Sequence, residues 1–506
     1  MNIIHGDCLE ELKKLEDNSI DAVVTDPPYG LSNTKPAQVA DVLKAWVTGD
    51  AVSVPAKRGG FMGASWDSFV PPPAVWEECM RVLKPGGHMA VFAGARTQDL
   101  MGLSIRLAGF EIRDTLGWIY GSGFPKSHDI GKAIDKCNGN PLAFREFAAA
   151  YREAVAKSGL THSAIDKALG IKSSSCYWAR DDHRGGMPPR HHWEKVRDLV
   201  YIPEELERLY DEAEREVVGA REVPQGYAFA GSTYGGDSSN KSVNVTIPAT
   251  SEAQRWDGWG TALKPAIEPI LLCRKPLDGT VANNVLAHGV GGLNIDACRV
   301  GMSYADREAA KVPQPTIRPD GKDSGHALGS GEGRNGATFE PAPAGRFPAN
   351  VLLDEHAAKE MDKQSGVSTS IRAPRSNGTD HRSCESYTPD SGSQEPRGHN
   401  DSGGASRFFP VFKYQAKAPK KERPVIERED GSKIQHPTVK PLTLLEWLVE
   451  LITPPSGVVL DPFAGSGTTL QAALNKGFTP IGIEQDADYI KLIEKRLEAT
   501  CTTHKN

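Results

Sequence analysis

Residues 457–469 read GVVLDPFAGSGTT, and this stretch decides the fold. Its apolar start predicts a buried strand that ends at Asp461. Gly465 and Gly467 allow a tight turn and a close approach of a ligand to the backbone. The sequence lacks both the third glycine of the dinucleotide fingerprint and the Gly-Lys pair of a Walker loop. A strand, a glycine-rich turn and a helix N-terminus in this order favour a negative ligand group at the turn.

A helix and a second strand follow this turn. We expect the helix over Leu470–Lys476 and the strand over Thr479–Glu484. The acid at the end of this strand lies 17 residues past Gly467, where a carboxylate can bind two ribose hydroxyls. The alternative is a βαβ unit that binds no ligand.

A second motif lies near the N-terminus, where the predicted strand Ser19–Thr25 runs into Asp26, Pro27, Pro28 and Tyr29. Open α/β sheets bind their ligands at the carboxyl ends of parallel strands. The prolines remove two N–H donors and leave rigid carbonyl groups. Asp26 and the Pro27 carbonyl could accept the two hydrogens of a planar amino group while Tyr29 stacks on the ring. As a turn, the same sequence needs no function.

The remaining apolar segments complete an α/β pattern. A helix over Pro71–Leu83, a strand over His88–Ala93 and a strand over Glu268–Arg274 predict a doubly wound, mainly parallel sheet with helices on both faces. Two further motifs are weak alone: the strand end before Asp7 and Cys8, and His436–Pro441 before a helix over Leu442–Ile452. The second suits a small carboxylate, because a lysine there lies next to a helix N-terminus.

A helical insertion interrupts this pattern at residues 141–215. Helical character covers Leu142–Ser158, Thr161–Leu169 and His192–Arg215, with Thr161 as a helix cap and Gly170 between two short helical pieces. Such a turn resembles a helix-turn-helix that binds DNA. The alternative is an insertion that only packs.

The segment 301–407 is rich in loops. Its large apolar residues between 366 and 407 are limited to Val367, Ile371 and Tyr387, which cannot bury enough surface to offset the entropy of ordering. We expect a long loop, a linker or a surface that orders on a partner. Residues 346–423 carry 13 Lys/Arg against 10 Asp/Glu, a small basic excess that is also typical of an ordinary solvated surface.

Composition restricts the class of protein. The 506 residues have a net charge of −6, which argues mildly against a generally basic nucleic-acid binder. No apolar run reaches the ~18 residues of a membrane span, and the N-terminus lacks the pattern of a secretory signal. Eight scattered cysteines without a Cys-x-x-Cys pair indicate neither a disulfide framework nor a zinc site, so we expect no metal. These features predict a cytoplasmic protein.

Three blocks together resemble the amino-methyltransferases of DNA, which methylate adenine N6 or cytosine N4. The blocks are Asp26–Tyr29, Phe463–Gly467 and His436–Pro441. The catalytic block precedes the cofactor block, an order that resembles the permuted β group. Arg113–Lys126 and Gly260–Ala266 are similar to segments of phage-type members.

The resemblance implies a division of the chain and a set of functional residues. Residues 1–140 and 216–300 would form the catalytic half, 408–506 the cofactor half, and 301–407 the target-recognition region. The implied cofactor is S-adenosyl-L-methionine, and the implied partner is double-stranded DNA; a separate restriction endonuclease is a further candidate partner. Asp26, Pro27, Pro28 and Tyr29 would hold the target base. The implied cofactor-binding residues are Asp7, Cys8, Thr438, Lys440, Asp461, Phe463, Ala464, Gly465, Gly467, Thr468 and Glu484.

Within this set, Glu484 would bind the ribose hydroxyls, and Phe463 would line the adenine pocket of the cofactor. Thr438 and Lys440 would hold the methionine carboxylate. The resemblance leaves three alternatives open. Asp26 favours adenine as the target, where a serine would favour cytosine. A glutamine methyltransferase would place its cofactor loop before an Asn-Pro-Pro-Tyr block. A DNA-binding protein on a decayed scaffold would need neither block intact.

Overall fold

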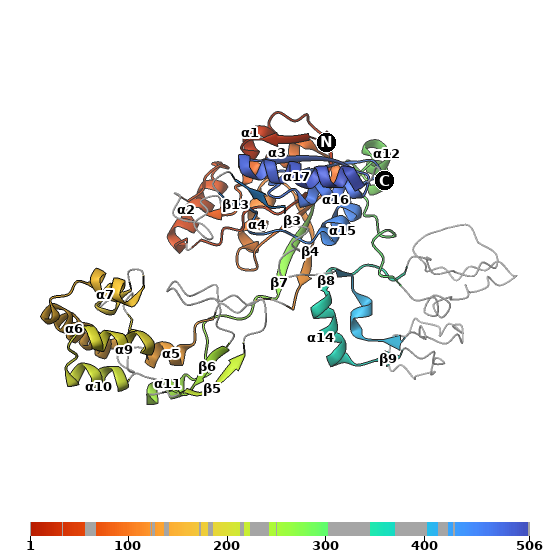
Figure 1. Cartoon of the computed structure of the whole chain (residues 1–506). Coiled ribbons are helices and arrows are strands. Elements are labelled where there is room, and N and C mark those ends of the chain that lie inside the picture. Colours follow the sequence, from red (N-terminus) through yellow and green to blue (C-terminus); the bar gives the residue numbers. More distant parts are fainter. Residues whose placement is uncertain are drawn as a thin grey trace, which may run out of the picture. The chain divides into compact units, whose positions relative to one another are not determined.

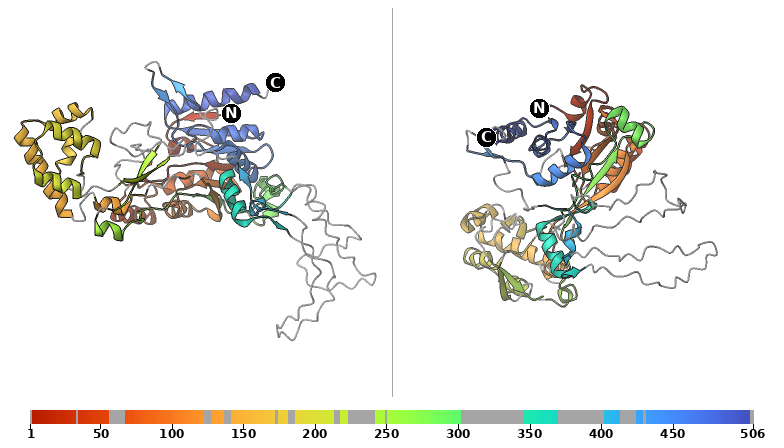
Figure 2. Two further views of the ribbon diagram at one scale, coloured as in Figure 1. Left: turned by 60° about the horizontal axis from the view of Figure 1, so that its bottom comes forward. Right: turned by 90° about the vertical axis from the view of Figure 1, so that its right-hand side faces the viewer.

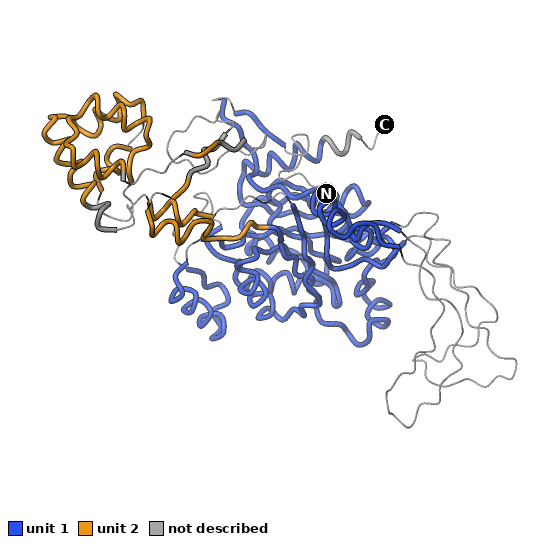
Figure 3. Tube along the Cα trace, turned by 90° about the horizontal axis from the view of Figure 1, so that it is seen from below, with its two compact units in different colours: residues 1–123, 266–506 blue, residues 124–265 orange. Residues whose placement is uncertain are grey.

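The computed structural model describes residues 2–32, 34–55, 67–121, 123, 127–135, 141–171, 174–180, 186–212, 217–222, 242–248, 250–301, 345–369, 402–412, 424–428 and 431–503. The chain separates into two compact units, coloured in Figure 3. Unit 1 comprises residues 1–123 and 266–506, and unit 2 comprises residues 124–265. The predicted helical insertion, 141–215, lies inside unit 2.

Unit 1 is built on a nine-stranded sheet (Figure 1). The order of its strands across the sheet is β1 (Asn2–His5), β15 (Thr479–Glu484), β14 (Val458–Asp461), β2 (Ile20–Thr25), β3 (Leu83–Phe92), β7 (Ile267–Arg274), β4 (Glu111–Ile119), β8 (Val351–Asp354) and β11 (Val411–Phe412). Neighbouring strands are parallel except that β7 runs antiparallel to both β3 and β4. The mainly parallel sheet is confirmed, and β7 is its exception.

Helices cover both faces of the sheet because alternate residues of the central strands point to opposite sides. On one face, Val23 and Met89 join the core beneath α1 (Cys8–Leu12), α2 (Pro36–Val47), α3 (Pro73–Val82) and α4 (Gln98–Leu107). On the other face, Val24 and Phe92 pack with α15 (Leu442–Ile452) and α16 (Thr468–Asn475). The doubly wound architecture therefore follows from strands that are buried on both sides.

Further helices and short strand pairs complete unit 1. They are α12 (Val281–His288), α14 (Glu355–Ser365), η3 (Ala405–Phe408), α17 (Ala487–Thr503), and the short pairs β9 (Ser368–Thr369) with β10 (Ser402–Gly403) and β12 (Ile426–Glu427) with β13 (Lys433–Ile434). No helix in the described part of the chain is long and apolar enough to cross a bilayer.

Several predicted segments need correction. The segment 301–407 contains regular structure, because β8 joins the main sheet and α14 follows directly, with Asp354 as its N-cap. Residues 302–344 and 370–401 of that prediction lie outside the described residues. β3 begins at Leu83, where we expected the preceding helix to end.

Strands from the two ends of the sequence lie side by side in this sheet. Strand β14 pairs with β2, so that Leu460 lies opposite Val23, and β1 pairs with β15. Figure 2 shows the red N-terminal strand beside the blue C-terminal elements. A buried hydrogen bond of 2.7 Å from the Thr25 hydroxyl to Asp461 Oδ1 joins β2 to β14. Asp26 and Asp461, each at a strand end, consequently lie at the same edge of the sheet.

Unit 2 holds a helical cluster with its own core, in which Phe147, Tyr151 and Trp193 are fully buried. Its elements are α5 (Ile130–Asp135), α6 (Pro141–Ser158), α7 (His162–Leu169), α8 (Ser175–Trp178), α9 (Arg190–Leu199), α10 (Glu204–Glu212), α11 (Ser251–Arg255) and the pair β5 (Val217–Glu222) with β6 (Ser242–Thr246). The single helical segment predicted over His192–Arg215 is wrong. Pro203 separates two helices there, since proline disfavours a helical residue before it.

The predicted helix-turn-helix corresponds to α7, Gly170 and α8. Gly170 ends α7 in the left-handed conformation, with φ +69°. Asp166 of α7 is buried and accepts the backbone N–H of Ser174 and of Ser175, so it fixes the start of α8. The second helix is a single turn of four residues. DNA binding by this segment stays a prediction.

We expect Thr161→Ala to weaken the α7 region by about 1 kcal/mol, the usual cost of a lost N-cap. The Thr161 hydroxyl accepts the backbone N–H of Ala164 at 3.2 Å, and alanine cannot replace this bond. Hydrogen exchange of the amides of α7 would measure the loss. Ser163→Ala is the control, because Ser163 is exposed on the same helix and should leave the exchange unchanged.

Candidate active site

The first cluster surrounds the carboxylate of Asp26 at the end of β2. The Tyr29 hydroxyl donates to Asp26 Oδ1 at 2.8 Å, and Lys440 Nζ donates to Asp26 Oδ2 at 2.7 Å. Lys440 Nζ also lies 3.0 Å from the Tyr29 hydroxyl and 3.4 Å from Glu268 Oε2. Its ammonium is 5.0 Å from the centre of the Phe92 ring. Two carboxylates, one phenol and one ammonium thus share a single half-buried site.

Local contacts hold the loop that carries Asp26. The backbone N–H of Gly30 donates to the buried Asp67 at 2.9 Å, and the Thr97 hydroxyl donates to the Tyr29 carbonyl at 2.6 Å. Gly30 has φ +67°, and a Cβ there would lie 2.7 Å from the backbone nitrogen of Val70. Only glycine fits that position without strain. The loop is therefore fixed independently of Lys440.

Burial and charge change the acidity of this cluster. Burial alone would lower the pKa of Lys440, but Asp26 and Glu268 outweigh it and raise that pKa above its ordinary value. Burial, followed by the charges of Asp26 and Glu268, raises the pKa of Tyr29 well above 10. Lys440 is consequently a cation and Tyr29 a neutral hydrogen-bond donor at physiological pH.

The second cluster is the glycine-rich turn between β14 and α16. The backbone N–H of Gly465 donates to Glu484 Oε2 at 2.7 Å, and that of Ala464 donates to the Ile483 carbonyl at 2.9 Å. Gly465 and Gly467 have φ +53° and +77°. The turn thus wraps around the end of β15 and brings its backbone to the Glu484 carboxylate.

Side chains brace both ends of this turn. The backbone N–H of Phe463 donates to Asp461 Oδ1 at 3.1 Å. The buried Arg496 donates from Nε to the Ser466 carbonyl at 2.7 Å. The Ser466 and Thr468 hydroxyls are 3.2 Å apart. Phe463 itself is partly buried against the core.

The N-terminal residues Asp7 and Cys8 lie next to Glu484. The Gly6 backbone N–H donates to the Glu484 carbonyl at 3.0 Å. Asp7 caps α1 through the backbone N–H of Leu9 at 3.0 Å, a structural role that its sequence context did not suggest. Burial, reinforced by Asp7, raises the pKa of the Cys8 thiol to about 12, so Cys8 is no nucleophile.

The segment 436–440 spans the distance between the two clusters. At its start, a Cβ on Gly465 would lie 3.0 Å from His436 Nε2, and the His436 ring packs edge-on against Tyr489 at 4.7 Å. At its end, Lys440 reaches Asp26. Thr438 is exposed, and its carbonyl lies 2.6 Å from His436 Nδ1.

The partners of Lys440 differ from those we expected. Its amine contacts Asp26 and Tyr29, and binding of a methionine carboxylate by Thr438 and Lys440 stays a prediction. Sequence reasoning missed His436, Tyr489 and Glu268. His436 is the first residue of the His436–Pro441 motif, so the sequence contained a signal for it. No local pattern singled out Tyr489 or Glu268.

We expect the free energy of unfolding to depend on pH through Asp461. Burial raises its pKa from 3.8 to about 6, against hydrogen bonds from Thr25, Thr469 and the Phe463 backbone that lower it. Because the folded state holds this proton more tightly, the associated stability is complete below the unfolded pKa and is lost as the pH rises through about 6. Between pH 4.5 and 7.5 the loss amounts to about 2 kcal/mol.

Urea unfolding of the wild type and Asp461→Asn at both pH values would measure this effect. The asparagine oxygen can accept the same bonds but does not titrate. We expect the difference in unfolding free energy between the two proteins to shift by about 2 kcal/mol toward the variant at the higher pH. An identical pH dependence in both proteins would contradict the burial of an ionisable Asp461.

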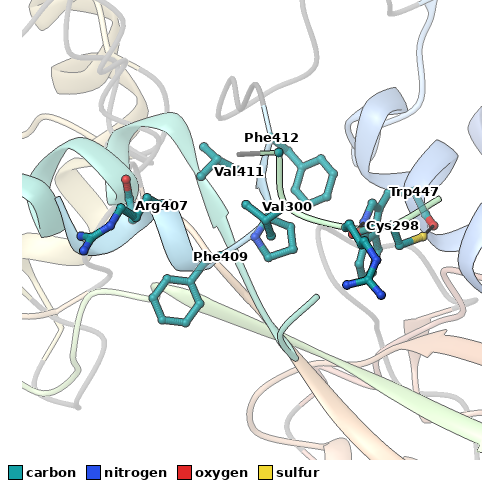
Figure 4. A pocket seen from close by; sticks show the side chains of 11 residues that line it. Cys298, Val300, Arg407, Phe409, Val411, Phe412 and Trp447 are labelled. Atoms are coloured by element: carbon teal, nitrogen blue, oxygen red, sulfur yellow. Dashed lines mark hydrogen bonds between the residues drawn. The ribbon is translucent and has the colours of Figure 1, made fainter. Parts of the chain in front are cut away.

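A separate hollow of about 370 Å³ lies elsewhere in unit 1 (Figure 4). It is lined by Cys298, Arg299, Val300, Gly301, Ser406, Arg407, Phe409, Pro410, Val411, Phe412 and Trp447. No residue predicted for the site belongs to this lining. Arg407 donates to the carbonyls of Gly403 and Gly404 at 2.6 and 2.7 Å, which shows that it supports the local backbone.

Comparison with known proteins finds partial matches to one family. Residues 253–495, a little under half of the chain, match the N6/N4 family described as DNA methylase. The protein YubD of Escherichia coli (strain K12) is 52% identical over 64 residues, which cover 13% of this chain and 28% of YubD. The DNA adenine methyltransferase YhdJ of the same strain is 46% identical over 63 residues, covering 12% of this chain and 21% of YhdJ. The chain therefore matches only about a quarter of the length of these relatives.

Among solved structures, the Thermus thermophilus protein TTHA0409 aligns over 99% of this chain and 95% of its own, with 13% identity and a TM-score of 0.33. TTHA0409 has also been solved in complex with S-adenosyl-L-methionine.

Proposed function

We propose that this chain transfers the methyl group of S-adenosyl-L-methionine to the exocyclic amino group of a base in double-stranded DNA, and that the base is adenine. The observation that carries the proposal is that the Asp26 carboxylate, at the end of β2, lies beside the glycine-rich turn, which follows the neighbouring strand β14. The match of residues 253–495 to the DNA methylase family supports the same chemistry.

The second cluster fits the cofactor. A ribose offers two hydroxyl donors, and Glu484 offers a half-buried carboxylate whose oxygens retain free lone pairs beside the Gly465 N–H. Gly465 and Gly467 hold the turn in a left-handed conformation, and a Cβ on them would meet His436 and Ile493. Phe463 would face the adenine of the cofactor, while Asp7 and Cys8 would border it. Bound there, S-adenosyl-L-methionine supplies an electrophilic methyl group on a sulfonium.

The first cluster fits the target base. A base inside a duplex is out of reach and must be flipped out, at a cost of a few kcal/mol. Tyr29 would recover part of this cost by stacking, which contributes ~1–3 kcal/mol per base. Asp26 and the Pro27 carbonyl would accept the two amino hydrogens, and Pro28 would keep the loop rigid.

These acceptors make the amino nitrogen reactive. Its lone pair is delocalised into the ring, so it is a poor nucleophile in solution. Hydrogen bonds to Asp26 and Pro27 favour a pyramidal nitrogen and stabilise the positive charge that develops on it during attack. The amino nitrogen would attack the methyl carbon directly, the bond from that carbon to sulfur would break with its electron pair staying on sulfur, and the surplus proton would leave the nitrogen to solvent afterwards. No nucleophilic side chain is required.

Two points favour adenine over cytosine. The motif begins with Asp26, which in this family favours adenine, and the matched relative YhdJ is a DNA adenine methyltransferase. Sequence selection would come from side chains outside the two clusters, in residues 141–215 and 301–407. Such side chains must reach base edges in the grooves.

The decisive test incubates the purified protein with unmethylated duplex DNA and S-adenosyl-L-methionine carrying a tritiated methyl group, then separates the nucleosides. Label in N6-methyldeoxyadenosine is the expected result. Label in N4-methyldeoxycytidine would preserve the mechanism and overturn the choice of base. No label in DNA would overturn the proposal; measuring cofactor binding would then separate another amine substrate from a decayed, DNA-binding scaffold.

A further inference from the structure

The direction of β7 brings a second carboxylate to the Asp26 cluster. Strands β3 and β4 end at the same edge of the sheet as β2, and β7 runs antiparallel between them. Its second residue, Glu268, therefore lies at this edge, opposite Trp118 of β4. A parallel strand would have placed the same residue at the far edge.

Glu268 and Asp26 share one cation. Lys440 Nζ lies 2.7 Å from Asp26 Oδ2 and 3.4 Å from Glu268 Oε2. Side-chain exposure is 13% for Lys440, 22% for Asp26 and 28% for Glu268, so solvent screens these charges only partly. In this state the ammonium is closer to Asp26 and occupies one of its two oxygens, while Tyr29 occupies the other.

The bonds of Lys440 and Tyr29 to Asp26 oppose the proposed methyl transfer. The role of Glu268 rests on that proposed function. Each Asp26 oxygen already accepts one hydrogen bond, so the target amino group would have to share an oxygen with the ammonium or with the phenol. The positive charge that develops on the amino nitrogen would also be repelled by an ammonium bound to the same carboxylate. Lys440 must move away from Asp26 without becoming an unpaired cation in a half-buried site, since such a charge is costly.

We propose that Glu268 is a positioning residue that takes over the Lys440 ammonium when the target base occupies Asp26. The exchange shifts one hydrogen bond between two carboxylates and transfers no proton. Lys440 stays paired throughout, and Asp26 gains a free oxygen for the amino group. Lys440 Nζ lies 3.4 Å from Glu268 Oε2, so a shift of a few tenths of an ångström brings it to full hydrogen-bond length with Glu268. A further rotation of the lysine side chain then takes the ammonium off Asp26.

Glu268→Gln and Glu268→Asp test the role of the charge. We expect Glu268→Gln to slow the single-turnover methyl transfer about tenfold, less than the ~10²–10³-fold cost of removing a group that contacts the reacting atoms. Glu268→Asp keeps the charge and should be clearly faster than Glu268→Gln. The dissociation constant for S-adenosyl-L-methionine should change less than the transfer rate in either variant, because Glu268 lies on β7, whereas the glycine-rich turn lies between β14 and α16.

A double-mutant cycle tests whether Glu268 acts through Lys440. In a Lys440→Met background, Glu268→Gln should change the single-turnover rate less than about twofold, because no cation remains to be exchanged. Equal tenfold losses in both backgrounds would overturn the proposal, as would equal rates for Glu268→Asp and Glu268→Gln. The comparison of Glu268→Asp with Glu268→Gln tests the proposal even if Lys440→Met is too slow to measure.

Glu111→Gln is the matched control. Glu111 pairs with Arg274 at the other end of β7, at 2.7 Å, so this variant also removes one carboxylate from an ion pair of that strand. It should leave the transfer rate unchanged. A wild type that methylates no DNA would refute the proposed function itself, whereas an active wild type with an equally active Glu268→Gln would refute only the role of Glu268.

Discussion

Replacing Asp26 with alanine is expected to slow methyl transfer by about 10³-fold or more while the protein still folds and binds S-adenosyl-L-methionine. The carboxylate would accept a hydrogen of the target amino group and face the charge that develops on its nitrogen, and loss of one such preorganised group costs ~10²–10³-fold. Here the loss reaches or exceeds the upper end of that range, because alanine removes a full negative charge that would face the developing positive charge, while Lys440 keeps Glu268 as a carboxylate partner in the cluster.

The fold should tolerate this change. The Asp26 loop is fixed through Gly30 and Thr97, whose bonds do not involve the carboxylate. Single-turnover transfer of tritiated methyl groups, together with calorimetric titration of the cofactor, measures both expectations. Asp41→Ala is the control, because Asp41 is exposed on α2 and should retain full activity. Activity within tenfold of the wild type would rule out Asp26 as the residue that accepts the amino group.

Replacing Glu484 with alanine is expected to weaken binding of S-adenosyl-L-methionine by at least about 100-fold. Hydrogen bonds to a charged group contribute ~1.5–3 kcal/mol each, and the carboxylate would accept two ribose hydroxyls. Alanine also removes the acceptor that holds the Gly465 N–H at 2.7 Å, so the turn loses this bond to β15 while its Ala464 N–H still donates to the Ile483 carbonyl. The dissociation constant, measured by calorimetric titration, should rise by this factor.

Two further variants distinguish the loss of the ribose contacts from the loss of the bond that holds the turn. Glu484→Gln keeps an oxygen for the Gly465 N–H but loses the charge, and should fall between the wild type and alanine. Asp486→Ala removes a neighbouring exposed carboxylate that bonds to the backbone of Asp488, and should bind the cofactor normally. Normal binding by Glu484→Ala would place the ribose elsewhere.

Local sequence patterns were sufficient to predict the elements that pack against segments close to them in the chain. The strand, turn and helix around Gly465 appear as predicted, apart from a helix that begins two residues earlier, at Thr468. The helix over Leu442–Ile452 is confirmed at both ends. Such patterns reflect burial and backbone conformation over about ten residues, and both can be predicted directly from the sequence.

The direction of β7 and the partners of Lys440 could not be predicted in this way. A strand buried on both faces has the same apolar pattern whether it runs parallel or antiparallel. Its direction depends on the connection through unit 2, and that direction decides whether Glu268 or Arg274 lies at the active edge. Lys440 and Asp26 are 414 residues apart, so no local pattern reports their ion pair. The division between α9 and α10, by contrast, was visible in Pro203.

The pairing of β2 with β14 has a consequence for synthesis on the ribosome. These strands lie side by side, but the hydrogen bond between Thr25 and Asp461 joins residues 436 positions apart. At ~5–20 residues per second, the earlier strand waits about 20–90 s for its partner. During that time an apolar strand has an open edge, which is a template for association with other chains. The nascent chain should therefore depend on chaperones until its last hundred residues emerge, and a messenger truncated before β14 should yield aggregated product.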